Sequence, residues 1–141
     1  MQKIFKILKA NVDSYSKIEQ ILHLPETTHD TQVRFALFCA KEAQKYVEKP
    51  KPESLKAIET VERFLLGKAT AEECKAAAAA ATPFAASYAA YATPTTPSGT
   101  SAAASYNATN AASNKAAEQT KQLNYLISLV VTVPMGKVLY G

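Results

Sequence analysis

Six consecutive alanines, Ala76 to Ala81, constrain the fold of this 141-residue chain more than any other feature. Alanine is the best helix former, because a helix costs its side chain no rotamer freedom. Just upstream, Thr70 and Glu73 have the spacing of a capping box, in which each side chain bonds a free backbone N–H of the first turn. The sequence therefore predicts a helix that begins near Thr70 and continues through the alanines.

This alanine helix is too weakly apolar to cross a membrane. The uncharged stretch from Ala76 to Thr96 contains Pro83, Pro94 and many hydroxyls, whereas a span needs about 20 strongly apolar residues. Pro83 is expected to kink or restart the helix. Beyond it, aromatic residues at i, i+4 and i+7 form one stripe on a short helix: Phe84, Tyr88 and Tyr91.

Apolar periodicity predicts further helices over residues 1–11, 14–24, 31–47, 53–67 and 101–130. The fold class is all-α, an irregular bundle of five to six helices, two of them alanine-rich, with a non-helical C-terminal tail. We expect a single helical domain over 1–141. Short N-terminal helices occupy 1–30, the core bundle 31–131 and the tail 132–141.

The helix over 31–47 is the expected centre of the bundle, because it is apolar around most of its circumference. One stripe is Val33, Ala36, Leu37, Ala40 and Val47, and a second face is Phe35, Phe38 and Cys39. Cap signals mark several helix ends: Asp13 or Ser14, Thr28 or Asp30, Gly67, and Thr100 or Ser101. The two alanine-rich helices are expected to pack against each other at short distance.

Composition argues against several classes of function. The net charge of +4 comes from lysines interspersed with glutamates, so no nucleic-acid partner is expected. Three lysines interrupt the apolar N-terminus, which therefore does not resemble a signal peptide. Cys39 and Cys74 lie far apart without zinc-ligand spacing, as in reduced thiols of a cytoplasmic protein. We expect no membrane association.

Catalytic chemistry is not evident. His23, His29 and Asp30 lie near one another in sequence and leave a hydrolase as a third interpretation, but Asp30 also suits a helix cap. The chain has no glycine-rich phosphate loop and no hydrolase or metalloprotease motif. We expect no enzyme, no catalytic residue, no metal and no cofactor.

Binding is better supported by one segment rich in tyrosine and asparagine. Tyrosine offers a stacking face and a hydroxyl, and asparagine offers both a donor and an acceptor. The three asparagines recur at i, i+3 and i+7 on the expected last helix. The candidate binding residues are Tyr88, Tyr91, Tyr106, Asn107, Asn110, Asn114 and Lys115. The alternative is structural: asparagines that keep an alanine helix soluble, and tyrosines that fill gaps between thin helices.

Residues 31–130 resemble a group of alanine-rich helical proteins of bacteria and phages, some labelled immunity proteins of toxin–immunity systems and others uncharacterised. The similar segments are FALFCAKEAQKYV, the stretch AIETVERFLLGKATAEECKAAAAAA, and the final KQLNYLISLV. This chain departs from the group in its TPTTPSGT loop and in having no histidine or tryptophan in its alanine helices. The resemblance implies a small helical protein of toxin–immunity or phage–host conflict.

Two functions follow as expectations. The first is a non-enzymatic inhibitory protein of a bacterium or phage that occludes a partner protein. The second is a phage anti-defence protein that sequesters a nucleotide-like small molecule, which the tyrosines and Lys115 would bind. Thin alanine helices also suit packing between subunits, so either function is compatible with a homo-oligomer.

Overall fold

The fold is all-α, as predicted. The computed structural model describes residues 2–81, 89 and 98–131, and this part of the chain contains helices and no strand. The helices are α1 (Gln2–Lys9), α2 (Ser14–Leu22), α3 (His29–Gln44), α4 (Pro52–Leu65), α5 (Ala71–Ala81), α7 (Ser98–Ala111) and α8 (Lys115–Val130). Described helices thus number seven, rather than the five to six expected.

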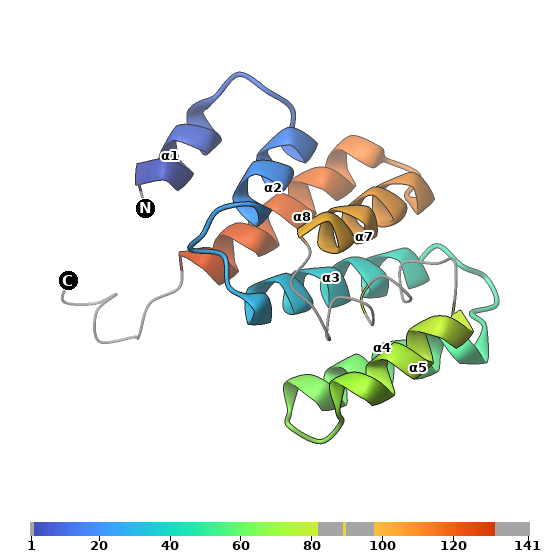
Figure 1. Ribbon diagram of the computed structural model, residues 1–141. Helices are drawn as coiled ribbons and strands as arrows, with labels where there is room; N and C mark the ends of the chain where they lie inside the picture. Colours follow the sequence, from blue (N-terminus) through green and yellow to red (C-terminus); the bar gives the residue numbers. More distant parts are fainter. Residues whose placement is uncertain (1, 82–88, 90–97, 132–141) are drawn as a thin grey trace.

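Helix α3 lies at the centre (Figure 1). Helices α2, α7 and α8 pack together on one side of it, and the α4–α5 hairpin lies on the other. Val33 and Ala36 on one face and Phe35 and Cys39 on another are all fully buried. The prediction of a central helix is therefore confirmed. Val47 is an exception, because α3 ends at Gln44 and leaves Val47 44% exposed.

Alanine sets how closely the helices approach. Helix α7 presents Ala104 and Ala108 inward, both fully buried, and its main packing partner is α3. The main partner of α5 is α4. Within the described residues, α5 and α7 are not a major packing pair, and the part of the first alanine-rich helix beyond Ala81 that was expected to pack there lies mostly outside the described residues. Each alanine-rich helix instead packs against a helix that has larger side chains, and these larger side chains fill the space between the two helices.

Four predicted cap signals are confirmed, whereas the predicted start at Thr100 or Ser101 is wrong, because α7 begins at Ser98. Asp13 accepts the Ser16 N–H at 2.8 Å, and Thr28 accepts the Thr31 N–H at 3.2 Å. In the capping box, Thr70 Oγ1 accepts the Glu73 N–H at 3.1 Å, and the Glu73 carboxylate accepts the Thr70 N–H at 3.2 Å. Gly67 has φ +75°, the left-handed conformation expected after a helix.

The predicted continuous helix over 101–130 is wrong. Helix α7 begins earlier, at Ser98, and ends at Ala111; α8 begins at Lys115. At the break, Asn114 is extended, with φ −120° and ψ 94°, and its side chain accepts the Ala117 N–H at 3.1 Å. Serine and asparagine side chains compete with helical hydrogen bonds in this way. Folding back lets α7 and α8 bury Ala108 and Leu126 in one core.

No helix in residues 2–81 or 98–131 is both long and apolar enough to span a bilayer. The predicted kink at Pro83, the Phe84 stripe and the tail over 132–141 lie outside the described residues.

Candidate functional site

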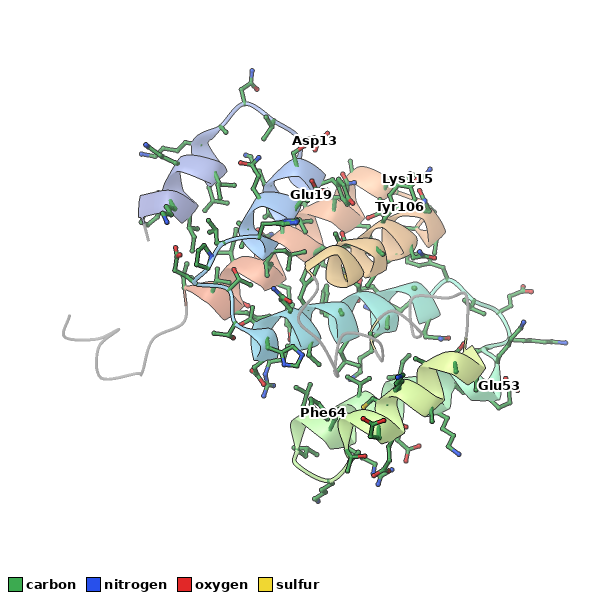
Figure 2. All side chains as sticks on the ribbon, viewed as in Figure 1. Asp13, Glu19, Glu53, Phe64, Tyr106 and Lys115 are labelled. Atoms are coloured by element: carbon green, nitrogen blue, oxygen red, sulfur yellow. The ribbon has the colours of Figure 1, made fainter. Side chains whose placement is uncertain are left out.

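The outward face of α7 presents two of the predicted binding residues, Tyr106 and Asn110. Tyr106 is 57% exposed, and Asn110, one turn further, is also exposed. The opposite face of the same helix is buried at Ser105, Ala108 and Thr109. Tyr106 and Lys115 both lie on the α7–α8 side of the molecule, away from α4 and α5 (Figure 2). We call Tyr106, Asn110 and Lys115 the Tyr106 face.

A second tyrosine adjoins this face. The rings of Tyr15 in α2 and Tyr106 meet edge to face, with centroids 6.3 Å apart and planes at 67°. Burial raises the pKa of the Tyr15 hydroxyl, and the charge and hydrogen bond of Glu19 raise it further. The Tyr15 hydroxyl therefore stays protonated at neutral pH. The sequence analysis did not identify Tyr15, because it lies 91 positions from Tyr106 and only the folded chain brings the two together.

The three asparagines do not form one stripe. Asn107 is half-buried and donates its side-chain N–H to the Ala103 carbonyl of its own helix at 3.3 Å. Asn114 caps α8 rather than extending α7. Asn110 alone of the three is exposed within a helix and has its side chain directed outward. The helix break at residues 112–114 is the physical reason why Asn114 is not part of the stripe. Tyr88 and Tyr91 lie outside the described residues.

A buried polar cluster, which the sequence analysis missed, supports α7 from beneath. Gln122 of α8 is fully buried, and its Oε1 accepts the Ser105 hydroxyl of α7 at 2.6 Å. Its Nε2 lies 3.3 Å from Thr109 Oγ1 and 3.1 Å from Glu118 Oε2. Ser105 and Thr109 are sequence neighbours of Tyr106 and Asn110, so these bonds fix the rotation of α7 and hence the outward direction of the Tyr106 face.

Glu42 of α3 extends this cluster. Its carboxylate is bonded by Lys45 and by Lys121 of α8, the latter at 2.9 Å. Both lysines are more than half exposed, whereas the Glu42 side chain is 4% exposed. From the sequence, a glutamate at the polar end of a helix is expected to be exposed. The signal for its burial is the helical spacing from Cys39, which places both residues on one face of α3.

Both cysteines are buried thiols, and His23 is exposed. Burial raises the pKa of the Cys39 thiol well above its usual range, and Glu118 and Glu42 raise it further, so the thiol stays protonated. His23 is exposed and lies 2.7 Å from the Glu19 carbonyl through its Nδ1. Asp30 pairs with Arg34 at 2.6 Å. Across residues 2–81 and 98–131, no group of three His, Cys, Asp or Glu side chains is placed to hold a metal ion.

Two open grooves formed by described residues lie away from the Tyr106 face. One, of about 170 Å³, lies between α3, α4 and α8 and includes Arg34, Lys41 and the stacked pair Phe38 and Tyr125. The other, of about 300 Å³, lies between α4 and α5 and is lined by Lys56, Thr60, Arg63, Glu73, Ala76, Ala77 and Ala80. Asp30 and Glu62 already neutralise Arg34 and Lys41 at the first groove.

No protein-family model matches this chain, and neither curated proteins nor solved structures show significant similarity to it. The resemblance to bacterial and phage alanine-rich proteins therefore stays a prediction.

Proposed function

We propose that this protein is a non-enzymatic inhibitory binding protein of a bacterium or phage, and that it covers a partner protein with its Tyr106 face. The observation that supports this most is the exposure of Tyr106: 57% of a large aromatic side chain is open to solvent on a helix whose other face is anchored by Gln122. Exposed aromatic residues on rigid supports are the side chains from which protein interfaces draw most of their binding energy.

The chemistry of this face suits a protein surface. Tyr106 supplies apolar area and a hydroxyl, while Asn110 and Lys115 supply donors at its edge. Since all three are exposed residues of α7 and α8, a partner reaches them without any helix moving. Inhibition then follows from occlusion. Two buried free cysteines agree with action in the cytoplasm of a bacterium or an infected host.

The second candidate is sequestration of a nucleotide-like small molecule. The edge-to-face pair of Tyr15 and Tyr106 favours it, because such a pair offers one free ring face for stacking a base. Lys115, on the same side of the molecule (Figure 2), would then contact a phosphate. A homo-oligomer is compatible with either function, since a second copy extends the same face.

A site-specific photocrosslinker distinguishes the Tyr106 face from the rest of the surface. The crosslinking residue is placed at position 106 in one variant and at position 66 in a control, because Leu66 is 70% exposed and lies at the end of α4. In infected or toxin-exposed cells, we expect one protein adduct at position 106 that is missing at position 66. Equal labelling at both positions, or none at 106, contradicts the proposed surface.

Native mass spectrometry of the purified protein decides between the two candidates. An added mass of about one nucleotide per subunit, lost in the Tyr106→Ala variant, supports sequestration. A chain with nothing bound, together with the position-106 adduct, supports occlusion of a protein. The Asn110→Ala variant should weaken binding in either case without changing the melting temperature, because its side chain is exposed.

A further inference from the structure

Two carboxyl groups face each other in the buried cluster beneath α7. Glu42 comes from α3 and Glu118 from the first turns of α8, and each residue is 3% exposed. The two carboxyl groups lie within interaction range of each other, and neither Glu42 Oε1 nor Glu118 Oε1 has a well-formed hydrogen bond among the described residues. Two carboxylates in contact repel unless a proton lies between them, because both offer only acceptor atoms.

The positive charges near this pair all bond one member. Lys45 bonds Glu42 Oε2, and Lys121 Nζ lies 2.9 Å from Glu42 Oε1. Glu118 has no lysine or arginine within ion-pair distance among the described residues. Its Oε2 faces the Gln122 amide at 3.1 Å, while its Oε1 is buried and has no donor there. An ionised carboxylate in that position leaves one oxygen unsatisfied, which is costly in a protein interior.

We propose that Glu42 and Glu118 share one proton in the folded chain and that this proton helps to hold α8 against α3. The Glu118 carboxyl, in its neutral form, donates its O–H to the Glu42 carboxylate, which keeps its negative charge against Lys45 and Lys121. When hydroxide or a buffer base removes the proton, two buried carboxylates remain in contact, and of the contacts that Glu42 makes with α8 only the Lys121 ion pair still attracts. This inference does not depend on the partner or ligand proposed above.

The pKa directions of the two glutamates agree with a neutral Glu118 and an ionised Glu42. Burial raises the pKa of Glu118, and the charge of Glu42 raises it further against the lowering by Gln122. Burial also acts to raise the pKa of Glu42, but hydrogen bonds from Lys45, Lys121 and Glu118 outweigh it and lower that pKa overall. Cys39 lies beside both as a neutral thiol, Tyr46 lies near Lys121, and α7 contributes the hydroxyls of Ser105 and Thr109.

The direction of the pH effect follows from the raised pKa of Glu118. In the unfolded chain this carboxyl loses its proton at the ordinary glutamate pKa, whereas the folded chain holds the proton to higher pH. The stabilisation is therefore complete in acid and is lost as the pH rises through the folded-state pKa. Glu42 acts in the opposite direction, since its lowered pKa gives a stabilisation that is lost as the pH falls.

Urea unfolding followed by circular dichroism tests this between about pH 5 and about pH 8. The Glu118→Gln variant keeps a hydrogen-bond donor towards Glu42 but cannot titrate. We expect the urea midpoint of the wild type to fall as the pH rises and that of Glu118→Gln to change much less. The control is Glu62→Gln, whose half-exposed carboxylate pairs with Lys41 and which should keep the wild-type slope. Parallel profiles for the wild type and Glu118→Gln overturn the proposal.

A second measurement uses only the wild-type chain, so it remains valid if the Glu118→Gln variant folds poorly. Carbon-detected NMR of the wild-type chain, labelled at the glutamate carboxyl carbons, follows each carboxyl through its titration. We expect one glutamate to titrate above the range of the others and a second, coupled one below it. Titration of every glutamate within the ordinary range contradicts a shared proton.

Discussion

The rings of Phe38 in α3 and Tyr125 in α8 lie stacked, with centroids 4.2 Å apart and planes 8° from parallel. Both side chains are half-buried, and they join the two helices at the groove between α3, α4 and α8. Aromatic pairs in contact contribute about 0.5–1.5 kcal/mol beyond the area they bury. We expect a double-mutant cycle of Phe38→Ala and Tyr125→Ala, measured by urea unfolding, to give a coupling free energy of that size. Purely additive losses would show that the rings pack independently.

Replacing Gln122 with alanine should be among the most destabilising changes in α8. Gln122 is fully buried and bonds Ser105, Thr109 and Glu118. Its removal deletes these hydrogen bonds and opens a cavity, at a cost of about 2–4 kcal/mol in the free energy of unfolding. The matched control is Gln119→Ala in the same helix, which is half-buried and should cost less than about 0.5 kcal/mol. Equal losses would argue against the buried network.

Alanine substitutions at Asn114 and Asn110 should differ in their effect on the free energy of unfolding. Asn114→Ala removes the cap of α8 and should lower the unfolding free energy by about 0.5–2 kcal/mol. Asn110→Ala removes an exposed side chain of α7 and should change it by less than about 0.5 kcal/mol. Thermal unfolding of the two variants side by side checks this. A larger loss at Asn110 than at Asn114 would favour a continuous helix through residue 114.

Substitutions at Gly67 test the effect of the backbone conformation alone. A Cβ added there meets nothing within 4 Å, yet the residue has φ +75°. Any loss in Gly67→Ala therefore reflects the left-handed conformation, and we expect about 1–2 kcal/mol in the free energy of unfolding. Gly67→Asn should lose less, because asparagine tolerates this conformation. Identical stability of the alanine variant and the wild type would show that the turn after α4 relaxes at no cost.

Local signals in the sequence predicted the fold well. The capping box at Thr70, the glycine at 67 and the apolar circumference of α3 each depend on residues within a few positions, and each is confirmed. The break between α7 and α8 was missed, because alanine on both sides of Ser113-Asn114 suggests an uninterrupted helix. Asn114 is a local signal for the break, because it caps α8, but the burial of Ala108 and Leu126 in one core also favours folding back, and no local pattern records that gain.

The candidate site was predictable only in part. Tyr106, Asn110 and Lys115 are exposed, and Tyr106 and Lys115 lie on the α7–α8 side of the molecule, but their role in binding stays a prediction. Tyr15, Glu42 and Gln122 were not identified, because each becomes informative through a contact with a distant segment. Glutamate and glutamine are usually exposed, so their burial is visible only once α3, α7 and α8 are placed together.

The alanines of α7 have a consequence for how this sequence can change over evolution. At Ala104 and Ala108, which are fully buried, a side chain larger than serine would push α7 away from its neighbouring helices, of which α3 is the main one. Exposed alanines such as Ala76 and Ala80 are free to become lysine, glutamate or glutamine. Selection therefore keeps the side chain small at the buried alanines and does not restrict it at the exposed ones. Among homologues, the positions that keep alanine should trace the inner face of α7, while the others drift in composition.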